Sequence, residues 1–494
     1  MDRRLVISLI LLWSLVSISS GQWGQEINLT DGSVGGSWTA FNNARGLACR
    51  GDTVYLVWHD FRVSPRNYGC EIYFKYFDGN NWSADAVIGT FGVARYYFNW
   101  NPSCVVDDQG RLHVVWESNG INAPNSGDYD IVYRLLSGGA WSSPLKLTSH
   151  PLYSWYPSLV CRSGGRLDLF FQDNRSGSFK IFHKIFNGST WEQEYCLDTL
   201  CQSAGYPSAA VSQDRPAVAW QDFRTGVSQI FFRRLGPSGW EADSAVSHSI
   251  WGAYCPCLAS DEAGNLHLVW EDFGDGNSEI YYRRLETATQ TWGPVIRVTY
   301  DPAHSRQPTL ACRGDSLVDI FWADDRDGNY EIYYLRIKNG LWGTEQRLTF
   351  QSAFSLYPTV AADYRGNLHL AWSDQRVAAG YAPDIYYRKY TAEPAGVLPP
   401  GQEGLGFGEL TIYPNPSSGS VNISFNLGAG ASARPLRLEI YNISGQLVHR
   451  QSWPDQSWGP KNWCWVGQGF SPGVYLASLS DGRRRTTQRF VILK

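Results

Sequence analysis

Methionine and excess charge are scarce in this sequence. One Met occurs among 494 residues, whereas aromatic residues, including 22 Trp, make up 15%. This bias disfavours helices and favours the pleated, half-buried surfaces of β-sheets. The 42 Lys and Arg residues nearly balance the 46 Asp and Glu residues, so the net charge is −4. A chain with so little net charge shows no preference for nucleic acid or another polyanion.

Long apolar runs are also scarce, and the one candidate lies at the N-terminus. Arg3 and Arg4 precede an apolar run from Leu5 to Ile18, and small residues follow. The run is shorter than the ~20 residues that span a bilayer, which disfavours the alternative of a membrane anchor. We predict a signal peptide in residues 1–21, cleavage near residues 19–22, and an exported mature protein without an integral membrane segment.

The 10 cysteines do not form the dense pattern of a disulfide framework, and no Cys and His spacing matches a zinc site. Five of them stand at nearly the same place in successive repeats, where one small buried residue per repeat explains them. These five are Cys49, Cys104, Cys161, Cys257 and Cys312. Cys196 and Cys201, in CLDTLC, are the best candidates for a local disulfide.

A strand–turn–strand unit recurs seven times, and one copy reads VWEDFGDGNSEIYYRR from Val269 to Arg284. A large aromatic residue anchors each copy at a spacing of 49 to 58 residues. The anchors are Trp58, Trp116, Phe171, Trp220, Trp270, Trp322 and Trp372. A short apolar run precedes each copy, and most copies are followed by Trp and a segment ending in Thr, such as WGPVIRVT. Four short strands per period of ~50 residues predict the blades of an all-β propeller.

The seventh copy lacks its fourth strand, because IYYRKY runs directly into a Pro-rich segment. The missing strand is at the other end of the chain, where QWGQEINLT (Gln22–Thr30) aligns with LWGTEQRLT (Leu341–Thr349). An open ring would expose sheet edges. We therefore predict that Glu26–Thr30 pairs with the strand containing Asp384–Tyr390 and closes a seven-bladed propeller over residues 22–390. A six-bladed ring with a spare unit is the alternative, and it leaves this complementarity unexplained.

The composition changes after the propeller. Residues 391–408 predict a Pro/Gly linker, and the short strands of residues 409–494 predict a small Ig-like β-sandwich. YPNP, YNISGQLV, SPGVYLASL and RFVILK follow one another in this order. This order resembles the C-terminal sorting domain of type IX secretion cargo and the related Ig-like module of the flagellar hook-capping protein. The resemblance implies a bacterial protein that meets the secretion machinery, crosses an outer membrane and is secreted or held on the cell surface.

The first strand of the repeated unit ends in Asp-x-Arg in five copies. In a propeller this hairpin lies on the same face as the connections between blades, which lead to the central channel. Repetition favours a structural role, in which Asp fixes the turn and Arg bonds to it or to a neighbouring blade. Ligand binding is the alternative. We align the second copy with Glu117 and Asn119 in these places. The candidates are Asp60, Arg62, Asp173, Arg175, Asp222, Arg224, Asp272, Asp324, Arg326, Asp374 and Arg376.

Tyr and Trp are frequent in the connections between blades. Aromatic rings beside charged groups suit sugar binding, because the rings cover apolar C–H faces while the charged groups bond hydroxyls or an acid group. Three tyrosines share the context Tyr-Pro and are assigned to packing: Tyr156, Tyr206 and Tyr357. Three tryptophans differ between blades and are predicted to contact a ligand: Trp100, Trp155 and Trp251.

The repeats resemble those of sialidase-like and related bacterial propellers. The turn YFDGNNW (Tyr76–Trp82) looks like a degenerate Asp-box, which stabilises the fold and says little about activity. The arginines, Tyr–Glu pair and acid Asp of a sialidase cannot be assigned, so whether the protein is an enzyme stays open. We predict a propeller that binds a glycan or another extracellular ligand. A sialidase-like glycoside hydrolase and a surface protein-interaction scaffold are the alternatives.

No cofactor or metal is predicted. Calcium is an alternative in the hairpin DDRDGNYE, where Asp325, Asp327, Asn329 and Glu331 place oxygen ligands at alternate positions. The equivalent hairpins NRSGSFK and FRTGVSQ lack these residues, which disfavours that alternative.

Overall fold

The computed structural model describes residues 22–30, 35–41, 45–62, 69–89, 97–120, 128–314, 317–376, 382–392, 410–413, 420–427, 436–442, 446–453, 459–466, 471, 473–480 and 485–492. Within these ranges the regular structure is β-strand, apart from the short turn η1 (Ser163–Gly165). No helix in the described chain is long and apolar enough to cross a membrane. The predicted all-β fold class is confirmed. The predicted signal peptide lies outside the described residues.

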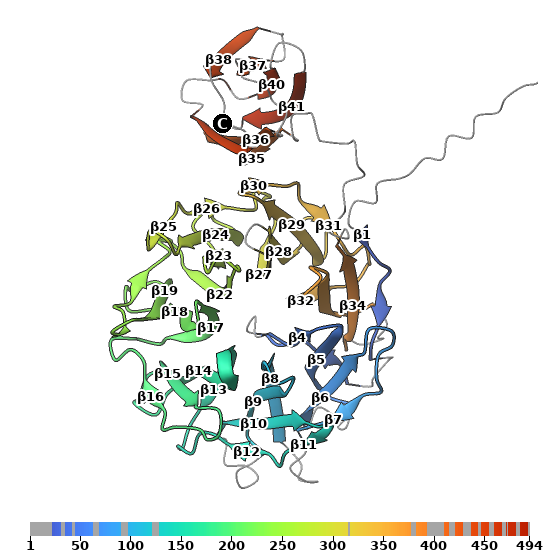
Figure 1. The fold of residues 1–494 in the computed structure, drawn as a ribbon, viewed down its shortest axis with the longest axis vertical. Coiled ribbons are helices and arrows are strands. Elements are labelled where there is room, and N and C mark those ends of the chain that lie inside the picture. The colour runs from blue at the N-terminus through green and yellow to red at the C-terminus, as the bar shows by residue number, and fades with distance from the viewer. Residues whose placement is uncertain are drawn as a thin grey trace, which may run out of the picture.

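The strands of residues 22–392 form a ring of similar sheets (Figure 1). We number its units 1 to 7 in the order of their aromatic anchors. The innermost strand of unit 1 is split into β3 (Ser37–Trp38) and β4 (Leu47–Arg50), which both pair with the second strand. The other innermost strands are β8 (Tyr97–Val106), β13 (Ser154–Arg162), β17 (Gly205–Ser212), β22 (Ala253–Ser260), β27 (Ser305–Arg313) and β32 (Ser355–Ala362).

Two long strands and short outer segments complete each unit. The second strands are β5 (Thr53–Asp60), β9 (Leu112–Ser118), β14 (Arg166–Asp173), β18 (Arg215–Asp222), β23 (Leu266–Asp272), β28 (Leu317–Asp324) and β33 (Leu368–Asp374). The third strands are β6 (Gly69–Phe77), β10 (Asp130–Ser137), β15 (Lys180–Phe186), β19 (Gln229–Gly236), β24 (Glu279–Glu286), β29 (Glu331–Lys338) and β34 (Asp384–Thr391). The outer segments of units 1 to 6 are β7 (Ala86–Val87), β11 (Ala140–Trp141), β12 (Leu145–Lys146), β16 (Tyr195–Cys196), β20 (Gly239–Trp240), β21 (Ser244–Ala245), β25 (Thr291–Trp292), β26 (Ile296–Arg297), β30 (Leu341–Trp342) and β31 (Gln346–Arg347).

The N-terminal segment supplies the outer strands of unit 7, as the sequence predicts. β1 (Gln22–Trp23) and β2 (Ile27–Asn28) pair antiparallel with β34, with Trp23 opposite Tyr390 and Ile27 opposite Tyr387. The backbone N–H of Leu29 continues the ladder to the carbonyl of Ile385 at 2.8 Å. The predicted pairing is therefore confirmed.

The number of units depends on how one sheet is divided. Units 3 to 7 form separate sheets, whereas units 1 and 2 share a ten-stranded sheet. These two units are joined by a short parallel pairing of β6 and β8, with Gly69 opposite Tyr97 and Cys70 opposite Phe98. We divide the sheet at this pairing, and the ring then consists of seven units.

The hydrophobic core lies between neighbouring units. Trp322 of unit 6 packs in one cluster with Ile280 of unit 5, and Trp58 of unit 1 packs with Ile385 of unit 7. Burying a large apolar side chain stabilises a fold by ~1.5–3 kcal/mol. The repeated aromatic therefore holds each unit to the one before it. All seven anchors are fully buried: Trp58, Trp116, Phe171, Trp220, Trp270, Trp322 and Trp372.

Nine cysteines of the described chain are free thiols, so the predicted disulfide between Cys196 and Cys201 is wrong. Cys196 packs against the cluster between units 2 and 3, whereas Cys201 is buried in the cluster between units 3 and 4. The five repeated cysteines lie on innermost strands, which agrees with one small residue per repeat. They are Cys49, Cys104, Cys161, Cys257 and Cys312.

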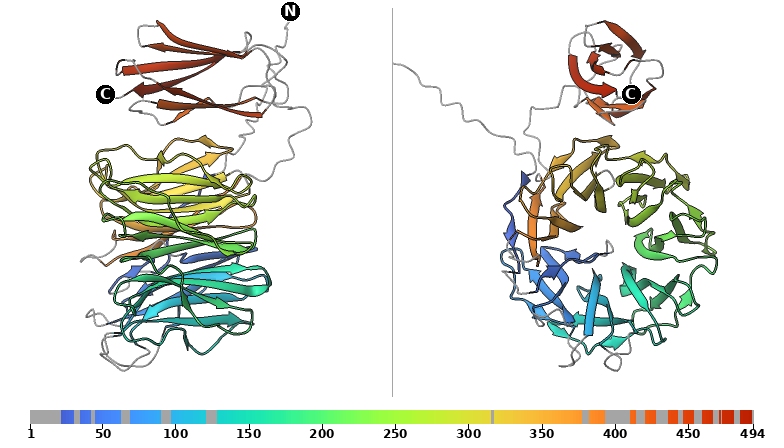
Figure 2. Two further views of the ribbon diagram at one scale, coloured as in Figure 1. Left: turned by 90° about the vertical axis from the view of Figure 1, so that its left-hand side faces the viewer. Right: turned by 180° about the vertical axis from the view of Figure 1, so that it is seen from behind.

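The C-terminal residues form a separate two-layer β-sandwich (Figure 2). One sheet contains β35 (Thr411–Tyr413), β36 (Ser420–Leu427) and β39 (Gly459–Val466). The other contains β37 (Leu436–Asn442), β38 (Leu447–Trp453), β40 (Gly473–Ser480) and β41 (Arg485–Ile492). Its core includes Val421 and Phe425 of the first sheet and Leu438 and Phe490 of the second. The predicted small sandwich is therefore present.

Candidate ligand site at the channel mouth

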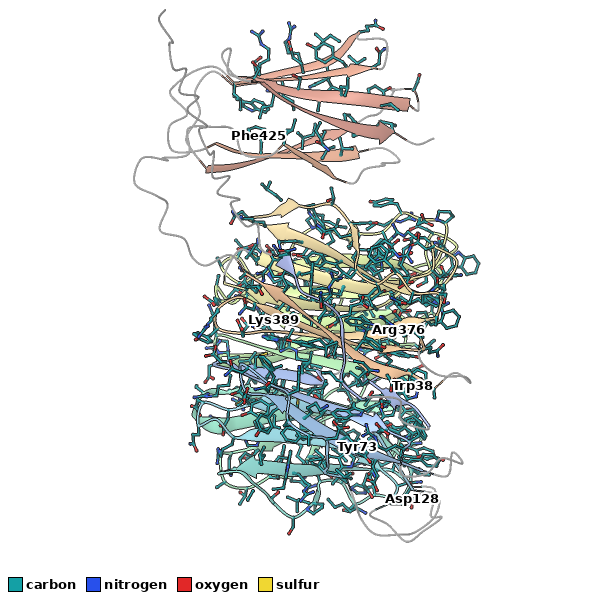
Figure 3. All side chains as sticks on the ribbon, turned by 90° about the vertical axis from the view of Figure 1, so that its right-hand side faces the viewer. Trp38, Tyr73, Asp128, Arg376, Lys389 and Phe425 are labelled. Carbon is teal, nitrogen blue, oxygen red and sulfur yellow. The ribbon has the colours of Figure 1, made fainter. Side chains whose placement is uncertain are left out.

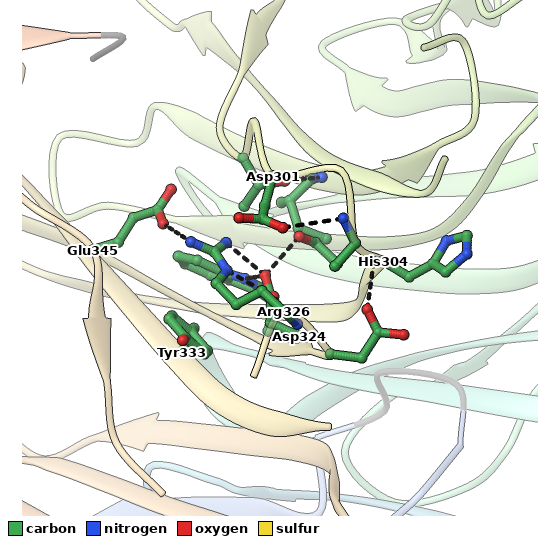
Figure 4. Close-up of polar contacts among 12 residues, drawn as sticks. Asp301, His304, Asp324, Arg326, Tyr333 and Glu345 are labelled. Atoms are coloured by element: carbon green, nitrogen blue, oxygen red, sulfur yellow. Dashed lines mark hydrogen bonds and ion pairs between the residues drawn. The ribbon is translucent and has the colours of Figure 1, made fainter. Parts of the chain in front are cut away.

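The Asp-x-Arg hairpins form an internal ion-pair motif, which Figure 4 shows for unit 6. The carboxylate of Asp324 is buried and accepts a hydrogen bond of 2.9 Å from Nε1 of the anchor Trp322. Arg326 donates from Nε and Nη2 to the two oxygens of Asp324 at 2.7 and 2.6 Å. Its Nη1 reaches Glu345 at 2.6 Å, and its guanidinium lies 4.5 Å above the ring of Tyr333. The guanidinium therefore joins the hairpin to the outer strand.

Four other units repeat the pairing of the Arg with the hairpin Asp and with a second acid. The arginines are Arg62, Arg175, Arg224, Arg326 and Arg376, and their second acidic partners are Asp85, Glu194, Asp243, Glu345 and Glu26. In unit 5, Asp272 accepts hydrogen bonds from Trp270 Nε1 and the N–H of Gly274. The carboxylates of Asp60, Asp173, Asp222, Asp272, Asp324 and Asp374 are thus buried and bonded internally. This geometry favours the structural role, and ligand contact by these residues stays an untested prediction.

The register corrects our alignment of the second copy by one residue. Asp130 lies opposite Ser118, as Glu71 lies opposite Asp60. Ser118 therefore stands in the Asp position, and Glu117 points to the other face of the sheet, since side chains alternate along a strand.

The residue after the aromatic anchor binds the backbone of the next unit. Glu117 Oε2 accepts the N–H of Tyr156 at 2.7 Å, and Glu271 Oε1 accepts the N–H of Gln307 at 2.6 Å. Gln172 and Gln221 do the same for Tyr206 and Cys255, at 3.1 and 3.2 Å. A side-chain oxygen at this position therefore fixes the start of the neighbouring innermost strand.

The residues held in this way are Tyr156, Tyr206, Cys255 and Gln307, and they share an unusual backbone conformation with Asn101 and Tyr357. Each precedes a proline at the bulge of an innermost strand and has φ between 49° and 55°. A left-handed conformation costs a residue with a side chain roughly 1–2 kcal/mol. A bond from the N–H to the preceding unit offsets this cost in Tyr156, Tyr206, Cys255, Gln307 and Tyr357. Six units thus place one of these side chains at the same level of the ring, which we call the channel-mouth level.

The two supporting acids are protonated below about pH 7. Glu117 and Glu271 are buried, and burial raises the pKa of each carboxyl to about 7. Gln172 and Gln221 hold the same bonds without any charge. The protonated form of each Glu therefore accepts the backbone N–H as a neutral group, as Gln172 and Gln221 do.

Two tyrosines of this level form a direct contact. The rings of Tyr156 and Tyr206 stack with centroids 4.2 Å apart, and their hydroxyls are 3.1 Å apart. Burial raises the pKa of both phenols, so they stay neutral donors. Tyr357 contacts Phe41 instead, with ring centroids 4.7 Å apart. These contacts agree with the packing role assigned to the three tyrosines, although their rings are only half buried.

The three predicted ligand tryptophans lie in different surroundings. Trp100 is half buried, 4.9 Å from the ring of His59, and Trp155 stacks on Tyr153 at 4.5 Å. Trp251 is 66% exposed, in the connection between units 4 and 5. Of the three, Trp251 therefore has the freest ring face. Ligand contact by Trp100, Trp155 and Trp251 stays a prediction.

The connections and the hairpins share one face of the ring. In Figure 3, Trp38 at the start of an innermost strand and Arg376 of a hairpin lie toward one side, whereas Lys389 lies toward the other. We call the side of the hairpins the connection face. It carries further exposed apolar side chains in the connections between units: Leu152, Leu200, Ile250, Phe350 and Phe354.

Unit 1 departs from the repeat at the channel. Seven residues, Thr39–Arg45, separate Trp38 from Gly46, whereas only Tyr156 and Pro157 separate the equivalent residues of unit 3. The described part of this insertion crosses between units. Thr39 Oγ1 donates to the carbonyl of Tyr357 at 2.6 Å, and Phe41 N–H donates to Asn101 Oδ1 at 2.9 Å.

The insertion ends at a cavity in the centre of the ring. A space of about 320 Å³ is lined by Arg45 and by small or apolar residues of all seven innermost strands, including four cysteines. Arg45 Nη2 donates to the carbonyl of Leu258 in unit 5 at 3.0 Å, so this side chain reaches across the channel. The sequence analysis did not select Arg45. The available signal was an Arg two positions before Leu47 of LACRGD, where the other six copies have Pro.

One group of potential metal ligands occurs in the described residues: Asp198, Cys201 and Asp222. Nη2 of Arg224 donates to both carboxylates and to the sulfur of Cys201. A guanidinium thus occupies the position that a cation would take.

The calcium alternative also lacks a converging set of oxygens. Asp325 accepts the N–H of His304 at 2.6 Å, and Asp327 accepts the hydroxyl of Tyr333 at 2.5 Å. Asn329 uses its amide nitrogen, which donates to backbone carbonyls. These side chains therefore brace the hairpin.

Comparison with known proteins identifies the C-terminal part. Residues 411–493 match the family model of the secretion system C-terminal sorting domain. The chain therefore carries a type IX sorting domain that interacts with the secretion machinery, and the protein is exported to the cell surface or secreted. No curated protein matches the sequence.

Three solved structures similar to this chain share little sequence with it. An ulvan lyase of polysaccharide lyase family PL25 shares 12% identity, with 75% of this chain and 96% of that chain covered at a TM-score of 0.49. The sialidase of Trypanosoma rangeli shares 10% identity, with 94% and 88% covered at 0.44. PorZ, a surface component of the type IX secretion system of Porphyromonas gingivalis, shares 12% identity, with 92% and 60% covered at 0.40. At these scores the similarities carry no functional conclusion.

Proposed function

We propose that this exported propeller binds an extracellular glycan on the connection face, at the mouth of the central channel. The observation that carries the proposal is the exposed ring of Trp251, in the connection that leads to Cys255 at the channel-mouth level, where other units place half-buried tyrosines and amide side chains. Aromatic faces cover the C–H surfaces of sugars, while the polar groups bond hydroxyls. The internal bonding of the Asp–Arg hairpins supports the same choice, because it leaves the non-repeated aromatics as the better ligand contacts.

A glycan array probed with the mature full-length protein tests the proposal. Trp251→Ala is expected to weaken binding of a captured glycan at least tenfold, which corresponds to ~1.4 kcal/mol. Tyr364→Ala is the matched control. Tyr364 is 67% exposed, but it lies in the turn between β32 and β33, at the opposite end of the innermost strand. Normal binding by Trp251→Ala, or capture of proteins but of no glycan, would contradict the proposal and favour the interaction-scaffold alternative.

A glycoside hydrolase is the second candidate, because two channel-mouth carboxyls titrate near neutral pH. An acid with a pKa of about 7, as burial gives Glu117 and Glu271, is matched to proton transfer at physiological pH. Fluorogenic glycosides distinguish the two candidates. A hydrolase would lose turnover by several orders of magnitude in Glu117→Gln or Glu271→Gln, whereas a binding protein would show no turnover in the parent.

A further inference from the structure

The insertion Thr39–Arg45 is the clearest break in the repeat near the channel. A feature present in every unit has a structural role in the ring, whereas an insertion in one unit indicates a separate function. Here the extra residues bring Phe41 into contact with Tyr357 and Asn101, which belong to the channel-mouth level. The last residue of the insertion, Arg45, lies beneath that level, in the cavity.

Arg45 brings the only charge to the cavity lining as the structure describes it. The other lining residues are aliphatic, Ser or Cys, such as Val160, Ser260 and Ala361. Over the described ranges, Arg45 donates a hydrogen bond to Leu258 and forms no ion pair with a carboxylate. Residues 42–44, which precede it, are Asn, Asn and Ala and bring no acid.

The hairpin arginines of this ring have different partners. Each hairpin Arg is held by two carboxylates, as Arg326 is by Asp324 and Glu345. A guanidinium has five N–H donors, and a planar oxyanion meets two of them at once. Among apolar walls the attraction between such a pair is stronger than in water. Arg45 is therefore suited to a ligand that supplies the missing negative charge.

We infer that Arg45 binds the oxyanion of an acidic saccharide, a carboxylate or a sulfate, that enters the central cavity from the connection face. The inference rests on the proposed glycan binding and names the ligand class. The aromatic residues at the mouth cover the sugar ring, and Arg45 takes its acid group. A cavity of about 320 Å³ accommodates one small acidic sugar unit, so the acid group belongs at a chain end.

Binding of simple probes by the full-length mature protein tests the inference. The probes are sodium glucuronate, sodium sulfate and glucose, measured by calorimetry at low ionic strength. Glucuronate is expected to bind the parent at least tenfold more tightly than glucose, and sulfate is expected to compete with it. Arg45→Gln is expected to lose at least tenfold in glucuronate affinity, and Arg45→Lys is expected to retain part of it.

Arg365→Gln is the control of equal charge change. Arg365 is exposed in the turn between β32 and β33, away from the connection face. Its variant is expected to bind glucuronate like the parent. Melting temperatures near that of the parent show that the Arg45 variants are folded, and Arg45→Lys tests the inference even where Arg45→Gln is unstable.

Two results would overturn the inference. One is a parent protein that binds neither glucuronate nor sulfate, and the other is an Arg45→Gln variant that binds glucuronate as the parent does. Neutral glycans that still depend on Trp251 would then leave the proposed function standing. Conversely, glucuronate binding that depends on Arg45, together with glycan binding that is unaffected by Trp251→Ala, would support the anion site and contradict the proposed connection-face site.

Discussion

Thr30 donates a hydrogen bond of 3.1 Å from Oγ1 to Asp384 Oδ1, although 354 positions separate them in the sequence. The same hydroxyl accepts the N–H of Ile385 at 2.9 Å. Thr148 makes both bonds inside unit 2, to Asp130 and Ile131, at 2.8 and 2.9 Å. The closure of the ring therefore uses the same contacts as an ordinary unit.

Because the closing unit is built like an internal one, removing the same ion pair from units 6 and 7 is predicted to cause equal losses of stability. Glu26→Ala removes the second partner of Arg376 in unit 7, and Glu345→Ala removes that of Arg326 in unit 6. Each leaves a half-buried guanidinium with one carboxylate, so each is expected to lower the free energy of unfolding by about 1–3 kcal/mol. Urea denaturation of both variants measures it. A negligible loss for Glu26→Ala alone would mean that the N-terminal strand is not held like an internal one.

The hairpin motif predicts that the loss of its Asp lowers stability more in a unit that has the Arg than in a unit that lacks it. Asp324→Asn removes the charge that holds Arg326, whereas Asp272→Asn acts in the unit where Gly274 replaces Arg. Leaving a charged partner unpaired lowers stability more than losing a neutral hydrogen bond. Asp324→Asn is therefore expected to be more destabilising than Asp272→Asn, by about 1–2 kcal/mol. Thermal unfolding compares the two variants. Equal losses would refute the structural role assigned to the Asp–Arg pair.

The repeat explains why so much of the fold could be predicted. Every unit has a buried aromatic anchor, six units end the second strand in Asp, and most have Thr or Ser shortly after the outer segment. Trp23 and Thr30 carry the outer part of that pattern, so the missing strand could be found. The pairing of Cys196 with Cys201 could not be judged in this way, because sequence distance does not show that they face different clusters.

The candidate site was harder to predict, because it consists of departures from the repeat. Arg45 stands in NNARGL, which gives no indication that its side chain reaches across the channel to Leu258. The role of Glu117 depends on which face of its strand it occupies, and a shift of one residue reverses that face. Trp251, by contrast, could be selected because it differs from the equivalent positions of the other connections.

The sorting domain is predicted to be dispensable for the propeller. The segment between Ala392 and Leu410 is rich in Pro and Gly, which favours a linker between independently stable domains. A chain ending at Ala392 is therefore expected to melt within a few degrees of the propeller transition of the full-length protein. Calorimetry of both chains measures it, and a large downward shift would reveal a stabilising domain interface.

The last prediction concerns pH and follows from the two buried glutamates. Burial raises the pKa of Glu117 and Glu271 from 4.5 to about 7 in the folded state. A raised pKa means that the folded protein binds the proton more tightly than the unfolded chain. The stability from this difference is fully present below pH 4.5 and is lost as the pH rises through about 7. Glu271→Gln keeps the oxygen that accepts the N–H of Gln307 and removes the titration, so it is expected to stabilise the protein at pH 8 and to change little at pH 4. Gln221→Glu makes the opposite change, because it introduces a titrating carboxyl where Gln221 holds the N–H of Cys255.

Gln221→Glu is expected to destabilise the protein at pH 8, on the order of 1–3 kcal/mol, and to be tolerated at pH 4. Melting curves of the parent and both variants at the two pH values measure these effects. If Glu271→Gln instead destabilised the protein at pH 8, the ionised carboxylate would have to be the form that the fold uses, and the assignment of a neutral acid at the channel mouth would be wrong.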